Sequence, residues 1–208
     1  MSNKNIKFIL FDLGGVLVRI YPDKFFKYIA KYTEFDEDIL KKVSYIRRDI
    51  NFGYVSPEKI FKKLIIEYKI NLSVDEIIDK FLTLYIEEPI SYMINLVKEL
   101  KDNNYSIGLL SNTNELHINY LSKILEDYRY FDKLFFSHII HKIKPDKEVF
   151  EYVLKELNIS PQTILFIDDT FENIETAQSS GFNTLYVKMN NPFNKDITFS
   201  EFKKKYLS

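Results

Sequence analysis

Short apolar runs alternate with longer segments of helical periodicity along most of the chain. Five of the apolar runs have the length and composition of buried strands. They are Ile6–Phe11, Ser106–Leu110, Leu134–Phe136, Ile164–Ile167 and Thr184–Val187. Helical spacing of apolar residues is found between the later runs, near 89–103, 114–126, 146–157 and 171–180. Strands that alternate with helices are joined by right-handed crossovers, so the pattern predicts an α/β fold built on a parallel sheet.

Residues 20–86 differ from the rest of the chain because they contain no strand candidate. Apolar residues recur there at helical spacing, and two helix starts are recognisable. Ser56-Pro57 places proline at a first helical position, and Ser73–Glu76 matches a capping box. We therefore expect an insert of about four helices in this part of the chain. The expected boundaries are 1–18 and 87–208 for the sheet domain and 19–86 for the insert.

The insert leaves the predicted sheet shortly after Asp12. It is either a packed helical subdomain without a function of its own or a cap over the strand ends. After the last strand, residues 189–208 are expected to form a loop, including Asn190-Asn191-Pro192, and a short amphipathic helix over Phe199–Leu207.

Composition limits the chemistry that the chain can support. The 208 residues suffice for one sizeable core and a small accessory domain, and 46% hydrophobic residues with a mean hydropathy of -0.20 are typical of a globular protein. With 29 basic and 30 acidic residues the net charge is -1, which argues against nucleic-acid or membrane partners. The absence of cysteine excludes disulfides, thiolate metal sites and a cysteine nucleophile. Any metal would have oxygen ligands, as Mg²⁺ prefers.

The N-terminus, Met1–Lys7, lacks the shape of a signal peptide, and no apolar stretch approaches the roughly 18 residues of a membrane span. We therefore expect a cytoplasmic protein.

Polar residues follow three of the predicted strands at the point where each strand ends. Asp12 follows the first, Ser111-Asn112 the second, and Asp168-Asp169 the fourth. In a parallel sheet these ends meet at one edge, where open α/β sheets bind their ligands. Carboxylates so close together are unfavourable unless one is protonated or a cation lies among them. The pattern predicts a site that suits Mg²⁺.

Lys144-Pro145-Asp146, just before a predicted helix, supplies a cation and a helix start that could bind an anion such as phosphate. Each motif alone has a simpler explanation: Asp12 in a turn, Asp168-Asp169 at a solvated helix start, and the other motifs in surface loops. Together and in this order, they indicate one functional site.

With these motifs the chain resembles the haloacid dehalogenase-like (HAD) hydrolases, in the branch with a helical cap after the first motif. The resemblance covers nearly the whole chain. Its motifs are Asp12–Val16, Leu110–Thr113, Lys144–Asp146, and Phe166–Asp169 with Asn173 and Ala177. A narrower resemblance, to the bacterial α-D-glucose-1-phosphate phosphatase-like group, is carried by Ser111–Asn114 with His117, by Phe52–Ser56, and by Asp168-Asp169 with Asn173-Ile174.

The resemblance implies a Rossmann-like sheet with a helical cap, and a Mg²⁺-dependent phosphatase that acts on a small phosphorylated metabolite such as a sugar phosphate. Asp12 would be the nucleophile that forms an aspartyl-phosphate. Ser111 and Asn112 would hold the phosphoryl oxygens, and Lys144 would neutralise them and Asp12. The metal ligands would be Asp12, Asp168 and the backbone carbonyl of Gly14, with Asp169 orienting that shell.

The chain departs from the family pattern at Gly14, where most phosphatases of the family carry a second aspartate as general acid and base. General acid–base help contributes roughly 10²–10⁴-fold to a rate. Three explanations are open. The substrate could have a leaving group that needs little protonation. Water or another residue, with His117 and His141 as candidates, could carry the proton, or the protein could be a slow or inactive binder.

Two alternative functions follow from this departure. One is a metal-independent 2-haloacid dehalogenase, although dehalogenases lack the paired acids found here as Asp168-Asp169. The other is a weakly catalytic or regulatory protein that binds a phosphometabolite. For specificity, Tyr45, Arg47 and Arg48 lie on a predicted cap helix, where the arginines either recognise a second anionic group or form a solvated helix end.

Overall fold

The computed structural model describes residues 5–191 and 198–207. The expectations for residues 1–4 and for Pro192 concern positions outside the described residues. Among the described residues, no helix combines the length and apolar character needed to cross a membrane.

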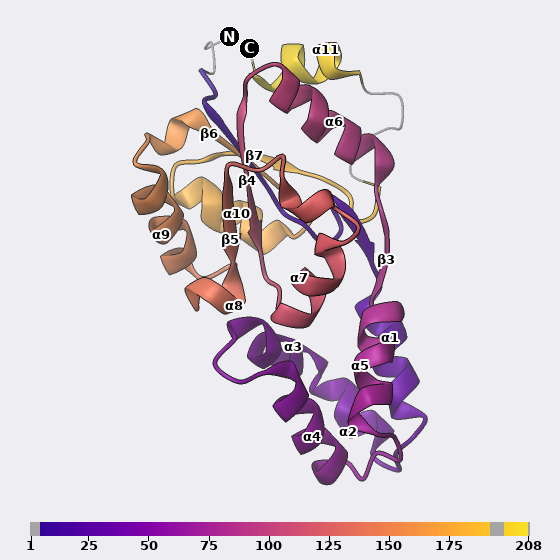
Figure 1. Ribbon diagram of the computed structural model, residues 1–208. Helices are drawn as coiled ribbons and strands as arrows, with labels where there is room; N and C mark the ends of the chain where they lie inside the picture. Colours follow the sequence, from indigo (N-terminus) through magenta and orange to yellow (C-terminus); the bar gives the residue numbers. More distant parts are fainter. Residues whose placement is uncertain (1–4, 192–197, 208) are drawn as a thin grey trace.

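The predicted parallel sheet is confirmed (Figure 1). Its five strands run in the order β5-β4-β1-β6-β7, and every neighbouring pair is parallel. Each strand overlaps one of the predicted apolar runs: β1 is Phe8–Phe11, β4 Ser106–Ser111, β5 Lys133–Phe136, β6 Ile164–Asp168 and β7 Asn183–Tyr186. Because β1 lies at the centre, between β4 and β6, the residues that follow these three strands emerge side by side at one edge of the sheet.

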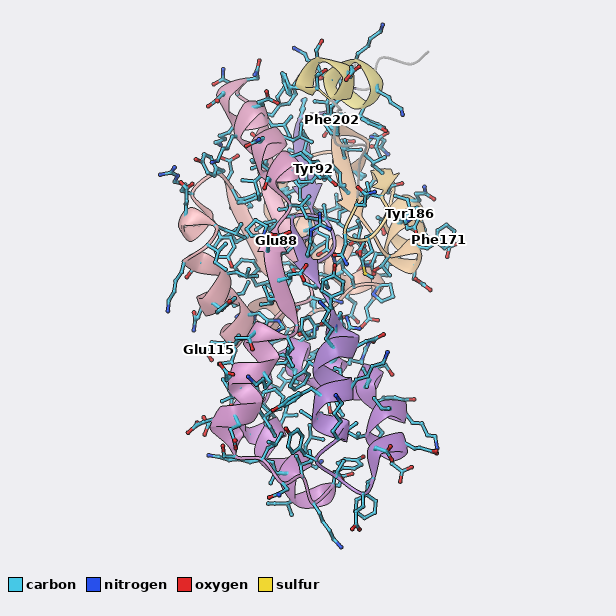
Figure 2. All side chains as sticks on the ribbon, turned by 90° about the vertical axis from the view of Figure 1, so that its right-hand side faces the viewer. Glu88, Tyr92, Glu115, Phe171, Tyr186 and Phe202 are labelled. Carbon is cyan, nitrogen blue, oxygen red and sulfur yellow. The ribbon has the colours of Figure 1, made fainter. Side chains whose placement is uncertain are left out.

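Helices cover both faces of the sheet because side chains alternate between the faces along each strand. Ile9 and Phe11 join a cluster with α6 (Ser91–Asp102), α7 (Glu115–Ser122) and the short α11 (Phe199–Phe202). Phe8 and Leu10 join a second cluster with α9 (Lys147–Leu157) and α10 (Phe171–Ser179). Phe202 of α11 is fully buried at the end of the molecule opposite the helical insert (Figure 2). The short elements that remain are α8 (Ser137–Ile140), η1 (Glu126–Tyr128), η2 (Pro161–Thr163) and the π-helical turn η3 (Lys203–Leu207).

The insert contains five helices, one more than expected. They are α1 (Pro22–Ala30), α2 (Asp36–Lys41), α3 (Val43–Phe52), α4 (Pro57–Glu67) and α5 (Val74–Thr83). Lys42, with φ -94° and ψ 1°, separates α2 from α3. The helices enclose a core in which Phe25, Phe61 and Phe81 meet with ring centroids 5.1–6.0 Å apart. The two capping motifs are formed as expected at Ser56 and Ser73.

A two-stranded antiparallel ribbon, β2 (Val18–Ile20) with β3 (Ile86–Pro89), joins the insert to the sheet domain. The sequence pattern missed both strands. They contain three and four residues, and β3 includes two glutamates and a proline, so neither has the alternation that identifies a strand. The ribbon bounds the insert on both sides and holds it next to the strand ends.

The C-terminal end of α3 contacts the sheet domain directly. The Ser137 hydroxyl lies 2.6 Å from the Asn51 carbonyl oxygen, and His141 Nδ1 lies 2.9 Å from the Phe52 carbonyl oxygen. Gly53 has φ 76°, and a Cβ atom there would lie 2.4 Å from the backbone oxygen of His138. Only glycine combines this left-handed conformation with so close an approach. The insert is thus held against the sheet domain beside the strand ends.

Candidate active site

The predicted carboxylates lie together at the carboxyl edge of the sheet. Asp12 follows β1, Asp168 ends β6, Asp169 comes next, and one oxygen from each lies within 4.8 Å of the others. Asp12 and Asp168 are buried, and Asp169 is half-buried. These three residues, called the acidic cluster below, are adjacent because β1 and β6 are parallel neighbours.

Burial disfavours the ionised forms of Asp12 and Asp169 in the acidic cluster. Burial raises the pKa of Asp12 from 3.8 to about 8; Lys144 opposes this shift, and Asp168 and Asp169 add to it. Burial and the charge of Asp168 raise the pKa of Asp169 to about 6. A cation bound among these oxygens would favour their ionised forms.

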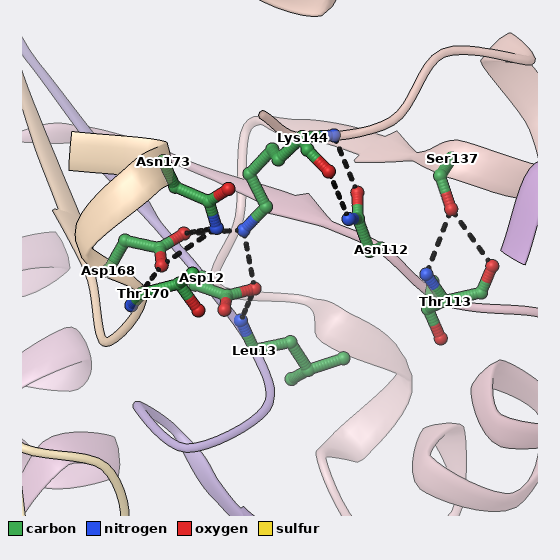
Figure 3. Close-up of polar contacts among 9 residues, drawn as sticks. All are labelled: Asp12, Leu13, Asn112, Thr113, Ser137, Lys144, Asp168, Thr170 and Asn173. Atoms are coloured by element: carbon green, nitrogen blue, oxygen red, sulfur yellow. Dashed lines mark hydrogen bonds and ion pairs between the residues drawn. The ribbon is translucent and has the colours of Figure 1, made fainter. Parts of the chain in front are cut away.

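Lys144 supplies a buried cation to the cluster (Figure 3). Its Nζ lies 2.9 Å from Asp12 Oδ1 and 2.6 Å from Asp168 Oδ2, and its side chain is 1% exposed. Burial alone would lower the pKa of Lys144, but the two carboxylates outweigh burial and raise it above 10.5. The lysine therefore stays charged and holds Asp12 and Asp168 in a fixed arrangement.

Asp168 is the most constrained member of the cluster (Figure 3). The backbone N–H of Thr170 donates to its Oδ1 at 2.8 Å, and the Asn173 amide donates to both of its oxygens at 3.0 and 3.1 Å. Asn173 lies in the first turn of α10, so the helix that follows β6 holds the carboxylate that ends the strand. In the sequence Asn173 stands out only as part of the family motif.

A family model of the haloacid dehalogenase-like hydrolases matches residues 6–181, most of the chain. The chain belongs to the HAD-like hydrolases. The family predicted from the four motifs is thereby confirmed, while the narrower resemblance to one phosphatase group stays a prediction.

Several HAD relatives are similar over most of their length. The D-ribitol-5-phosphate phosphatase of Bacteroides thetaiotaomicron is 29% identical over 207 residues, which cover 93% of this chain and 97% of that protein. A phosphorylated carbohydrates phosphatase of Thermotoga maritima is 22% identical, with 86% and 83% covered. A HAD family enzyme of Bacteroides thetaiotaomicron, solved in complex with magnesium and inorganic phosphate, superposes with a TM-score of 0.79 at 26% identity, covering 91% of this chain and 98% of that one.

Gly14 and Gly15, which follow Asp12 by two and three residues, are glycine for different structural reasons. Gly15 has φ 79°, and a Cβ atom there would lie 2.0 Å from Asp169 Oδ2, so glycine admits the carboxylate. Gly14 does not have a positive φ. Instead, a Cβ atom at Gly14 would lie 2.8 Å from Ile20 Cδ1. An apolar side chain from β2 thus fills the space where the family's second aspartate would begin.

The Asn112 side chain binds the backbone of Lys144 in the loop Lys144–Asp146, called the lysine loop below. Its amide donates to the backbone carbonyl of Lys144 at 2.7 Å and accepts from the Lys144 N–H at 2.9 Å (Figure 3). Both ends of the side chain are therefore engaged in positioning Lys144. The expected contact between Asn112 and a phosphoryl oxygen would fall to its backbone rather than to its amide.

A cavity of about 410 Å³ lies between the cluster and the insert. Its lining includes the predicted residues Asp12, Gly14, Ser111, Asn112, Lys144 and Asp169. Ser111 is buried at the end of β4. The insert and the ribbon add residues that sequence reasoning did not single out: Ile20, Tyr21, Asp23, Lys24 and Tyr85. No local pattern marks these residues, because their position depends on how the insert packs against the sheet domain.

The two histidines considered as proton carriers are both engaged in packing contacts. Burial lowers the pKa of His117 to about 3, so its ring is neutral near pH 7 and cannot act as an acid. The ring packs against Phe81, with centroids 4.2 Å apart, and lines the cavity as part of its wall. His141 contacts the Phe52 carbonyl and stacks on Tyr54 at the junction with the insert, outside the cavity lining.

The two adjacent arginines of α3 have separate environments. Arg48 forms an ion pair with Asp146 at 3.0 Å, across the junction between the insert and the sheet domain. Arg47 lines the cavity. Tyr45 is 70% exposed and lies outside the lining.

Proposed function

We propose that the protein is a Mg²⁺-dependent phosphatase that hydrolyses a small phosphorylated metabolite through an aspartyl-phosphate on Asp12. The observation that carries this proposal is the buried Lys144, which contacts both Asp12 and Asp168 and, together with Asp12, lines a cavity large enough for a small metabolite. A charged lysine beside a carboxylate nucleophile would neutralise the transferred group, which is the main catalytic requirement of phosphoryl transfer.

The reaction would have two steps at phosphorus. A carboxylate oxygen of Asp12 attacks the phosphorus atom, the bond to the ester oxygen breaks, and the leaving oxygen takes a proton from a water molecule. A second water molecule then attacks the phosphorus of the aspartyl-phosphate. The bond between phosphorus and the Asp12 oxygen breaks, the attacking water gives up a proton to solvent, and inorganic phosphate and the Asp12 carboxylate are released. Ser111 and the backbone of Asn112 would hold phosphoryl oxygens in both steps, and Lys144 would balance their charge.

The donor set fits Mg²⁺. Three carboxylates with oxygens within 4.8 Å of one another suit this hard cation. A bound cation would also offset the burial and mutual repulsion that raise the pKa values of Asp12 and Asp169. Asp12, Asp168 and the backbone carbonyl of Gly14 would hold the ion, with Asp169 orienting its shell. When bound, magnesium would supply charge neutralisation to the phosphoryl group.

The substrate class is supported by the relatives. The phosphatases of Bacteroides thetaiotaomicron and Thermotoga maritima are named for D-ribitol 5-phosphate and phosphorylated carbohydrates. We therefore place the substrate among small phosphorylated sugars, polyols and their oxidised derivatives. The dehalogenase alternative is disfavoured by the acidic cluster, which would repel a haloacid carboxylate in the absence of metal.

A panel of phosphorylated metabolites, assayed for phosphate release with Mg²⁺ and with EDTA, tests the proposal. We expect turnover of an aryl phosphate and of some sugar or polyol phosphates, and its loss on chelation. Without turnover on any substrate, the proposed activity would be wrong and a binding role would be favoured. Activity on 2-haloacids that survives EDTA would instead identify a dehalogenase.

A carboxyl group introduced at position 14 should restore a proton donor if room is made for it. We expect Gly14→Asp combined with Ile20→Ala to raise kcat/KM for alkyl phosphates, relative to aryl phosphates, by roughly 10²-fold. The second change removes Ile20 Cδ1, which would lie 2.8 Å from a Cβ atom at position 14 and would otherwise have to shift. The ratio of kcat/KM values, compared with that of Ile20→Ala alone, measures the effect. An unchanged ratio would show that leaving-group protonation does not limit the enzyme.

A further inference from the structure

Arg47 differs from the other three arginines of the chain in having no carboxylate partner. Arg19 pairs with Glu88, Arg48 with Asp146 and Arg129 with Glu126. Among the described residues, no carboxylate lies within 4.0 Å of Arg47, although its side chain is half-buried in the cavity wall. A guanidinium that is partly removed from water without an anion is unfavourable unless a ligand supplies one.

Tyr85 and His117 are neighbours of Arg47, and both are aromatic. Its Nε atom is buried and has no hydrogen-bond partner among the described residues. Its guanidinium carbon lies 6.0 Å from the centroid of the Tyr85 ring. Burial raises the pKa of the Tyr85 hydroxyl, and His117 is neutral, so neither neighbour supplies a negative charge near pH 7.

Arg47 and the reacting groups face one cavity from opposite parts of the fold. Arg47 belongs to α3 of the insert, whereas Asp12 and Lys144 belong to the sheet domain. Tyr85 lies close enough to both sides that the charges of Arg47 and Asp12 each act on its hydroxyl. The cavity volume of about 410 Å³ accommodates a small metabolite that reaches from the acidic cluster to this arginine.

We propose that Arg47 forms a subsite for a second anionic group, a carboxylate or a second phosphate, on the part of the substrate that is not transferred. This inference rests on the proposed phosphatase function and narrows its substrates to phosphorylated acids or bisphosphates. The planar guanidinium matches such groups because it can donate two parallel hydrogen bonds to their oxygens. A neutral polyol phosphate would leave the Arg47 charge without a partner.

Matched substrate pairs test the subsite. One pair is 3-phosphoglycerate and glycerol 3-phosphate, which differ by a carboxylate; the other is fructose 1,6-bisphosphate and fructose 6-phosphate, which differ by a phosphate. We expect the wild-type enzyme to prefer at least one charged member over its counterpart. In Arg47→Gln that preference should fall roughly 10–100-fold, mostly through KM, because a charge-assisted hydrogen bond is lost. Arg47→Lys should retain an intermediate preference, because lysine keeps the positive charge but cannot donate two parallel hydrogen bonds from a planar group.

The adjacent arginine provides the control. Arg48→Gln removes the same side chain one position along, but its ion pair with Asp146 is exposed and lies outside the cavity lining, so the preference should not change. Binding of the same four compounds to the Asp12→Asn protein, measured by calorimetry, reports on the subsite without turnover. Weaker binding of the charged members after Arg47→Gln in that background supports the subsite.

Three results would overturn the inference. One is a wild-type enzyme that treats both members of each pair alike, and another is a preference that survives Arg47→Gln. The third is an equal loss on charged and neutral members, which would assign Arg47 to the transferred phosphoryl group. The phosphatase proposal fails separately, when even an aryl phosphate is not hydrolysed with Mg²⁺.

Discussion

Asp12→Asn should abolish hydrolysis of phosphate esters while the protein stays folded. Asparagine keeps the shape of the side chain but lacks the carboxylate that would attack phosphorus. We expect kcat/KM on an aryl phosphate to fall by about 10⁴-fold or more, as when other covalent nucleophiles are removed. The fold should persist because the β1 strand and its pairing with β4 and β6 do not depend on this charge. Steady-state kinetics and thermal unfolding of the same preparations measure both effects.

The stability of this variant should carry a distinct pH dependence in metal-free buffer. The pKa of Asp12 is raised from 3.8 to about 8, so folding favours its protonated form. The contribution of Asp12 to the free energy of unfolding of the wild type is therefore fully present below pH 4 and is lost as the pH rises toward 8. Asp12→Asn lacks that loss, so its stability relative to the wild type should improve from pH 5 to pH 8.

Asp146→Asn is a suitable control for Asp12→Asn, because Asp146 lies in the lysine loop but its carboxylate pairs with Arg48 at the surface. This control should keep its activity. If Asp12→Asn retained more than a small fraction of the wild-type rate, the aspartyl-phosphate mechanism would be excluded. A stability difference that does not change with pH would contradict the raised pKa of Asp12.

The sheet could be predicted because each strand signal is local. The run that became β1 is fully buried, so it is apolar throughout, and Asp12 stands out directly after it. Parallel pairing then brings Asp12, Ser111 and Asp168 to one edge without further information. Prediction of the acidic cluster needed only the strand ends and the repulsion among carboxylates.

The features that were missed depend on tertiary packing. The strands of the β2–β3 ribbon have three and four residues, and they form through pairing with each other and through a bridge between Val18 and Gly14. Ile20 fills the space beside Gly14, although the two residues are separated by a turn and a strand start. The separate environments of Arg47 and Arg48 likewise arise from how α3 packs against the sheet domain. The domain boundaries and the roles of the site residues stay predictions.

Lys144→Met should destabilise the protein strongly and in a pH-dependent way. Lys144 is 1% exposed and compensates Asp12 and Asp168, so an uncharged side chain of similar length leaves buried carboxylates without a partner. Loss of one partner from a buried ion pair costs about 3–5 kcal/mol, which for a chain of this length lowers Tm by roughly 6–20 °C. The deficit should be larger at pH 8 than at pH 5, because Asp12, with a pKa of about 8, is protonated at pH 5 and begins to ionise near pH 8. Phosphatase activity should be lost at both pH values.

Lys142→Met is the matched control, two residues away. Its ammonium lies 3.4 Å from Glu148, whose side chain is 76% exposed, so the same change should alter stability by no more than roughly 0.5 kcal/mol. Magnesium should reduce the Lys144→Met deficit, since a divalent cation among Asp12, Asp168 and Asp169 replaces part of the missing charge. Thermal unfolding of both variants and the wild type at both pH values, with Mg²⁺ and with EDTA, measures these stability differences. An identical deficit under all four conditions would mean that Lys144 acts through packing alone and that its charge does not hold the acidic cluster together.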